Sequence, residues 1–202
     1  MFVIVVGIDP GTRHLGWGVV RRDGSRLRHL AHGVIDLDAR LSLPARLTRI
    51  DAELADVITA HHPDVGSVES LFFHKDAQAA AKLGHARGVV LLAFARAGVE
   101  IAEYAPAKVK RTVAGKGQAD KRQIQLMVRA VLALDELPRT DAADALALAV
   151  THLRLGPLAA RLAARPELEP SRVRANPALA RLRARRRAPS AAALLLAART
   201  AR

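Results

Sequence analysis

The order of hydrophobic and polar positions predicts strands in the first part of the chain. Residues 2–9 (FVIVVGID) form a continuous apolar run rich in β-branched side chains, which is typical of a strand buried on both faces. Two further strands are expected at 15–22 and 29–36, and the pair Asp23-Gly24 between them has the composition of a hairpin turn. The chain is therefore expected to begin with three consecutive strands.

Helical periodicity takes over from residue 43. Leucine, isoleucine and valine recur at helical spacing over 43–62 and form a single stripe, which predicts an amphipathic helix. Further helices are expected at 76–97, 122–134 and 140–156, with short strands at 64–70 and 99–105. Three strands followed by helices and strands in alternation predict an α/β fold, with a mixed sheet of five strands flanked by helices.

The pattern degrades after Gly156. Residues 157–202 combine repeated arginine with alanine, leucine and five of the ten prolines, a composition that does not bury enough apolar surface to order itself. We expect one folded domain at 1–156, which is long enough for a sizeable core, and a basic tail at 157–202 that is disordered or weakly helical.

The net charge of +13 points to an anionic partner, and most of the excess lies in the predicted tail. Residues 1–150 hold 20 Lys and Arg against 17 Asp and Glu, whereas residues 151–202 hold 12 Arg against two Glu. The chain has no cysteine, which excludes disulfides and thiolate metal sites. It shows no basic leader and no apolar run near the ~18 residues of a membrane span, so we expect a soluble, cytoplasmic protein with no membrane partner.

Four acidic residues stand out because their neighbours are apolar. Asp9 ends the first expected strand and Glu69 lies near the end of the fourth, while Asp141 and Asp144 share one face of the last helix. Buried carboxylates repel one another unless cations neutralise them. A site made of carboxylates alone suits hard ions, Mg²⁺ or Mn²⁺, and two such ions about 3.5–4 Å apart can clamp the attacking and leaving oxygens of a phosphodiester.

Each acid taken singly has a plainer interpretation. Asp9 precedes a Pro-Gly pair and could be an ordinary turn former, Glu69 could be a surface acid at a strand end, and Asp141 could stabilise the first turn of its helix. Asp144, within a run of alanine and leucine, is the hardest to explain without a site. The combination of all four in a basic protein favours the metal site.

A basic stretch at 108–122 precedes the third predicted helix. It holds Lys108, Lys110, Arg111, Lys116, Lys121 and Arg122 against a single acid, together with two glycines that let the backbone approach a phosphate closely. We interpret it as a phosphate-contact surface for DNA, and the alternative is a solvated charged face. Shortly after Glu69, either Phe72 or Phe73, followed by Lys75, could stack on an unpaired base, although either ring could also belong to the core.

Four segments of the chain, taken in order, resemble the RuvC family of bacterial Holliday-junction resolvases. They are GIDPGTRHLGWGVV (7–20), VESLFFHKDAQAAAKLGHARGVV (68–90), EYAPAKVKRTVAGKGQADKRQIQLMV (103–128) and TDAADALALAVTHL (140–153). The resemblance spans residues 1 to about 155 and does not include the tail. It implies an RNase H-like fold and a homodimer that cuts two opposing strands of a four-way DNA junction symmetrically, with Mg²⁺ as the cofactor.

The resemblance also implies roles for individual residues. The catalytic, metal-binding acids of the family fall here on Asp9, Glu69, Asp141 and Asp144, with two Mg²⁺ per active site and Mn²⁺ as a substitute. Some relatives carry histidine at the position of Asp141, which leaves open whether this residue binds metal directly or accepts a proton from the attacking water. Lys110 and Lys121 are implied as phosphate contacts near the scissile bond, and Phe72 as the stacking ring.

The resemblance further implies partners and a mode of assembly. The branch-migration complex RuvA–RuvB is an expected partner, and the helix at 76–97, rich in small residues, is expected near the two-fold axis of the dimer. From the residues alone, this helix could equally pack only on its own sheet.

Three other functions compete with this interpretation. An actin-like or sugar-kinase-type ATPase shares the GIDPGT start but needs a second domain, which about 155 folded residues cannot supply at usual sizes. A non-catalytic DNA-binding module would have no use for four desolvated carboxylates. The third alternative is a nuclease of the RNase H-like class with a different substrate. The basic stretch and Phe72 favour a junction over other substrates only through the resemblance.

Overall fold

The computed structural model describes residues 2–70 and 77–163, and only the backbone at 77–79 and 157–163. In chain order its elements are β1 (Phe2–Asp9), β2 (His14–Asp23), β3 (Arg26–Asp36), α1 (Leu43–His61), β4 (Val65–Glu69), α2 (Ala77–Ala97), β5 (Glu100–Tyr104), α3 (Pro106–Ala114), α4 (Lys121–Leu132) and α5 (Thr140–Ala163). All the predicted strands and helices are present within a few residues, and α3 is an addition. Residues 1–160 form one compact unit, which contains the whole sheet.

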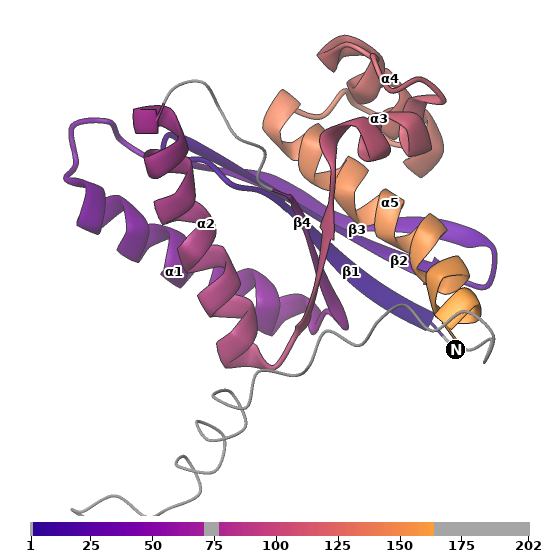
Figure 1. Cartoon of the computed structure of the whole chain (residues 1–202), viewed down its shortest axis with the longest axis horizontal. Helices are drawn as coiled ribbons and strands as arrows, with labels where there is room; N and C mark the ends of the chain where they lie inside the picture. Colours follow the sequence, from indigo (N-terminus) through magenta and orange to yellow (C-terminus); the bar gives the residue numbers. More distant parts are fainter. Residues whose placement is uncertain (1, 71–76, 164–202) are drawn as a thin grey trace, which may run out of the picture. The chain divides into compact units, whose positions relative to one another are not determined.

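The sheet is mixed and has the strand order β3-β2-β1-β4-β5. β2 runs antiparallel to both β1 and β3, whereas β4 runs parallel to both β1 and β5. Helices α1 and α2 cover one face, and α5 with α3 and α4 covers the other (Figure 1). The predicted α/β fold with a five-stranded mixed sheet is therefore confirmed.

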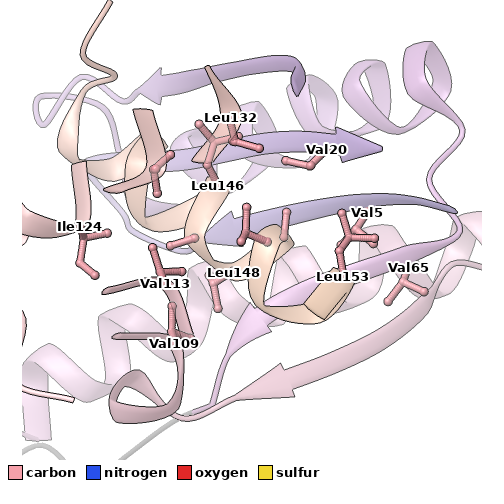
Figure 2. Close-up of a cluster of buried hydrophobic side chains, with 14 of the residues drawn as sticks. Val5, Val20, Val65, Val109, Val113, Ile124, Leu132, Leu146, Leu148 and Leu153 are labelled. Atoms are coloured by element: carbon pink, nitrogen blue, oxygen red, sulfur yellow. The ribbon is translucent and has the colours of Figure 1, made fainter. Parts of the chain in front are cut away.

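Each face of the sheet has its own hydrophobic core because side chains alternate along a strand. In β1, Val5 packs in the core under α5, whereas Val6 and Ile8 pack in the core under α1 and α2. Figure 2 shows the first of these cores, where Leu146 and Leu148 of α5 lie among valines of the sheet and apolar residues of α3 and α4. The same alternation places Gly7 and Asp9 on the α5 face.

Helix α5 lies directly on the sheet because glycines face it. A Cβ built on Gly7 would overlap the carbonyl oxygen of Ala145, and one on Gly16 would overlap the carbonyl oxygen of Asp141. These two glycines lie on neighbouring strands, and Gly16 is opposite Asp9 in the β1–β2 register. The first turn of α5 therefore meets the sheet by backbone contact, close to the end of β1.

Helix α5 runs on to Ala163, past the end expected at Gly156, although Pro157 lies inside it. A proline has no N–H to donate to the carbonyl four residues back, here that of Leu153. In the structure, Nη1 of Arg22 donates to this carbonyl oxygen at 3.0 Å. The guanidinium from β2 supplies the missing donor, and the helix continues. Residues 164–202 of the predicted tail lie outside the described part of the chain.

Helix α3 occupies the first half of the stretch that was interpreted as a basic surface. Pro106 stands in its first turn, and Gly115 ends it in the left-handed conformation, with φ of 75°. Gly115 is thus explained by a helix C-cap, and not by close approach to a phosphate. Helix α4 then starts at a capping box, in which the Asp120 carboxylate accepts from the Gln123 N–H at 2.8 Å and the Gln123 side chain accepts from the Asp120 N–H at 3.2 Å.

Candidate active site

Two of the four candidate acids end neighbouring parallel strands. Asp9 is the last residue of β1 and Glu69 is the last of β4. Ile8 is paired with Val68, so the two acids occupy the next positions of adjacent strands. Both acids lie on the α5 face of the sheet. For Glu69 this follows from Ser67, whose buried hydroxyl donates to the Leu148 carbonyl of α5 at 2.9 Å. Residues two apart in a strand lie on the same face, so Glu69 shares the face of Ser67.

The other two acids belong to the first turns of α5. Asp141 and Asp144 are half-buried in a helix whose other residues from Ala142 to Leu148 are buried. Because the backbone of α5 touches β2 at Gly16, the start of this helix is held over the end of β1. The ends of β1 and β4 and the start of α5 therefore bring the four predicted acids into one region.

A pocket of about 310 Å³, which we call the acid pocket, joins these elements. Its polar wall consists of Asp9, Glu69 and Asp144 together with Lys110 and Lys121. Apolar residues of α3, α4 and α5 complete it: Val109, Ile124 and Leu148, all labelled in Figure 2. Asp141 does not line the pocket.

Burial and mutual repulsion disturb the ionisation of the acids. The pKa of Asp9 is raised from 3.8 to about 7, first by burial and then by the negative charges of Asp144, Glu69 and Asp141, against a smaller opposing effect of Lys121. The pKa of Asp144 is also raised by burial, although Lys121 and Lys110 oppose the rise. The four acids therefore form one electrostatic group, including Asp141.

The donor set fits hard divalent cations. The acid pocket offers carboxylate oxygens and no thiolate or imidazole, which is the ligand type that Mg²⁺ and Mn²⁺ prefer. Burial, followed by repulsion from the other three acids, raises the pKa of Asp9 against the effect of Lys121, and a bound cation would relieve both costs. Within residues 2–70 and 77–163, no three Asp, Glu or His side chains lie close enough together to hold one ion as they stand, so the carboxylates would have to draw together around it.

Arg87 of α2 is a structural support of the site that the sequence interpretation missed. Its side chain is only 6% exposed and forms an ion pair of 2.8 Å with Glu103 of β5. Its Nη1 also donates to the backbone carbonyl of Glu69. One buried guanidinium thus ties α2 to the ends of β4 and β5. No local signal identifies it, because all of its partners are distant in sequence.

A second support joins the start of α5 to the sheet. Arg139 donates two hydrogen bonds to Asp36 at the end of β3, of 2.6 and 2.8 Å, and its own carbonyl accepts from the Ala143 N–H at 2.8 Å in the first turn of α5. Nδ1 of His14 lies 2.8 Å from the same Asp36 carboxylate. These contacts hold the pKa of Asp36 well below its usual range. The cluster fixes the backbone just before Asp141.

The predicted DNA-contact residues differ in where the structure places them. Lys110 of α3 and Lys121 of α4 line the acid pocket. The ammonium of Lys108 lies 5.6 Å from the centre of the Tyr104 ring. The remaining members are exposed on the same two helices and the loop between them: Arg111, Lys116 and Arg122. Phe72 and Lys75, with Phe73, lie outside the described residues.

The order of the strands and the helices on both faces of the sheet define an RNase H-like fold. A family model described as "Crossover junction endodeoxyribonuclease RuvC" matches residues 5–152. The chain therefore belongs to the RuvC family of crossover junction endodeoxyribonucleases. This assignment decides against the actin-like ATPase alternative.

Individual relatives agree with the family assignment. The chain is 60% identical over 170 residues to the RuvC of Sorangium cellulosum, and this match covers 84% of this chain and 95% of that protein. It is 49% identical over 150 residues to the RuvC of Rubrobacter xylanophilus, covering 74% of this chain and 84% of the relative. A match of 170 residues reaches beyond Gly156, so the first relative shares part of the region predicted as a tail.

Solved structures give the same result. A structure described as "T. thermophilus RuvC in complex with Holliday junction substrate" matches with a TM-score of 0.73 and 40% identity, covering 78% of this chain and 96% of that chain. The yeast mitochondrial Holliday junction resolvase Ydc2 has a TM-score of 0.57 at 13% identity, covers 78% of this chain and 82% of its own, and so shares the fold alone.

Proposed function

We propose that this chain resolves four-way DNA junctions as a Mg²⁺-dependent endonuclease that makes paired, symmetric nicks. The observation that carries the proposal is the acid pocket, where the pKa of Asp9 is raised to about 7 by burial and by three other carboxylates beside two lysines. Such a site gains most from binding divalent cations and a phosphate together. The solved complex of a 40% identical relative with a Holliday junction supports the choice of substrate.

The acids would hold the cations, and the lysines would hold the substrate. Asp9, Glu69 and Asp144 offer oxygen ligands for two Mg²⁺, or for Mn²⁺ as a substitute. When bound, the ions would lower the pKa of an attacking water and stabilise charge on the leaving 3′ oxygen. Lys110 and Lys121, which line the same pocket, would bind the non-bridging oxygens of the scissile phosphate. No side-chain nucleophile is required.

The placement of Asp141 favours the role of proton acceptor. Its charge acts on both Asp9 and Asp144, yet it does not line the acid pocket. A carboxylate at the margin of the pocket can take a proton from a water held inside it. Direct metal binding by Asp141 is the alternative, and the two roles predict different metal and pH dependence.

Phosphate contacts of the junction arms would extend from the pocket over α3 and α4. Lys108, Lys116 and Arg122 are exposed there, with Arg111 beside them on α3. Phe72 and Lys75 remain candidates for stacking and phosphate contact beside the cut, as predicted from the sequence. Charge on this surface would position DNA without reading its sequence.

A homodimer would supply the second active site for paired cuts. Helix α2 has an exposed stripe at Ala81, His85, Gly88 and Leu92, and Leu92 is 47% exposed. Its other face packs with α1 and the sheet through Val90 and Phe94. The helix thus packs on its own core through one face, and its exposed face could contact a two-fold partner.

The wider setting follows from the family. We infer that a RuvA–RuvB branch-migration complex is a partner and that the protein works in the cytoplasm, in recombination and repair. No helix within the described ranges is long and apolar enough to cross a membrane.

A cleavage assay tests the proposed function. In Mg²⁺, the chain should nick a mobile four-way junction on two opposing strands and leave a linear duplex of the same sequence uncut. Asp144→Asn should bind the junction without cutting it, whereas Asp56→Asn, on the exposed face of α1, should cut normally. Equal cutting of both DNAs would instead support an RNase H-like nuclease of other specificity, and binding without cutting by the parent chain would support a non-catalytic module.

A further inference from the structure

A β-bulge brings two histidines of β3 onto one face of the sheet. In the β2–β3 register, Val19 pairs with Ala31 and Val20 pairs with His29, which leaves Leu30 without a partner. Residues three apart in a regular strand point to opposite faces, and one extra residue reverses this. His29 and His32 consequently lie side by side.

The two imidazole rings meet through ring nitrogens. Nδ1 of His32 lies 2.8 Å from Nε2 of His29, the ring centres are 4.8 Å apart and the planes are inclined by 58°. Two neutral rings that both present a lone pair at this distance repel each other. Either one ring donates its N–H to the other, or both lone pairs bind the same cation.

The surroundings keep these nitrogens accessible and uncharged. The pair lines an open pocket of about 870 Å³ between β3 and the segment from Leu132 to Arg139. Burial lowers the pKa of both histidines, and His32 lowers the pKa of His29 further. Both shifts favour the neutral imidazole, which is the form that binds metals. Two arginines and two acids line the same pocket, so its formal charges cancel and the imidazoles themselves must supply the affinity.

We propose that His29 and His32 form a binding site for one late first-row divalent ion, Ni²⁺ or Cu²⁺, separate from the acid pocket. With metal–nitrogen bonds of about 2.05 Å, two nitrogens 2.8 Å apart subtend about 86° at the ion. That angle is close to the 90° between neighbouring ligands in tetragonal complexes of Cu²⁺ and Ni²⁺. A tetrahedral Zn²⁺ would need the nitrogens to separate to about 3.3 Å. Water would complete the coordination.

Ni²⁺ binding to the full, untagged chain tests the proposal by calorimetry, in excess Mg²⁺ so that the carboxylates are occupied. We expect one Ni²⁺ per chain at this pair. His29→Gln or His32→Gln should weaken binding by more than the roughly 10–100-fold lost when an outer-shell partner is removed. The Cu²⁺ electron paramagnetic resonance spectrum should show coupling to two nitrogens and lose it in either variant.

Two further variants make the test specific. His61→Gln with His62→Asn removes two adjacent histidines elsewhere, at the end of α1, and should leave Ni²⁺ affinity unchanged; asparagine is chosen because His62 has φ of 44°. Deletion of Leu30 keeps both histidines but removes the bulge, and should abolish the site if circular dichroism shows an intact fold. Absence of Ni²⁺ binding, equal loss in the control, or tighter binding of Zn²⁺ than of Ni²⁺ would overturn the proposal.

Discussion

The ionisation of Asp9 determines how the acid pocket affects stability when no cation is bound. Its pKa rises from 3.8 to about 7 on folding, so the folded chain keeps a proton that the unfolded chain has released between these values. The stability contribution is therefore fully present below about pH 4 and is lost as the pH rises through 7. The difference in pKa corresponds to roughly 4 kcal/mol, so the site costs stability wherever Asp9 is ionised and no cation is bound.

Asp9→Asn should reverse this cost. In the absence of divalent ions, the free energy of unfolding of the variant relative to the parent should rise by about 1–3 kcal/mol between pH 5 and pH 8, as measured by urea titration. Added Mg²⁺ should stabilise the parent and not the variant. Asp56→Asn serves as the exposed control. A difference that does not change with pH would contradict the assigned ionisation of Asp9.

Asp141→His distinguishes the two roles of Asp141. If the residue accepts a proton, the variant should cut junctions with Mg²⁺, and the pH dependence of cleavage should shift upward toward the pKa of histidine, about 6.5. If the residue binds metal, imidazole is a poor ligand for Mg²⁺, and activity should require Mn²⁺. Cleavage rates in both metals across pH 5–9 separate the two cases.

At the scale of elements, the sequence predicted those that its hydrophobic pattern marks clearly. The apolar run of β1 and the apolar stripe of α1 are the clearest such patterns, and the acids were recognisable because Asp9 ends one apolar run and Asp144 lies within another. Helix α3 was missed because it is short and strongly basic, although Pro106 in its first turn was an available signal. The continuation of α5 past Pro157 could not be predicted, since it depends on Arg22, more than 100 residues earlier in the chain.

A double-mutant cycle tests this last contact. Arg22→Met leaves the Leu153 carbonyl without its donor and should lower the free energy of unfolding by about 1–3 kcal/mol. Pro157→Ala restores the N–H that a helix normally supplies, so the double variant should recover most of the loss. Arg26→Met, at an exposed position of β3, is the matched control. Additive effects of the two substitutions would show that they do not act on one carbonyl.

At the scale of the whole molecule, charge is distributed very unevenly. Residues 1–150 have nearly balanced charge, whereas residues 151–202 hold 12 Arg and two Glu. The phosphate contacts that we propose near the cut are those of Lys110 and Lys121, which line the acid pocket, and the C-terminal arginines have no part in the proposed chemistry. Their charge can still attract DNA through its phosphates.

Deletion of residues 164–202 should therefore weaken junction binding most at low salt and reduce the slope of log affinity against log salt. The cut positions should not change. The deletion begins after Ala163 because α5 extends to that residue. Binding titrations at several salt concentrations give the slope, and an unchanged affinity at low salt would exclude a role of this segment in DNA binding.

The backbone contact of α5 with Gly7 and Gly16 has a consequence for how the site varies over time and among variants. In most cores, a substitution is accommodated by changes of side-chain rotamer and by small changes in the distance between packed elements. At these two glycines no side chain separates the helix backbone from the sheet, so the approach of α5 is limited there by backbone contact. The distance between the strand acids and the helix acids should therefore change little when side chains elsewhere in the core are substituted. It should also stay constant on heating until α5 separates from the sheet.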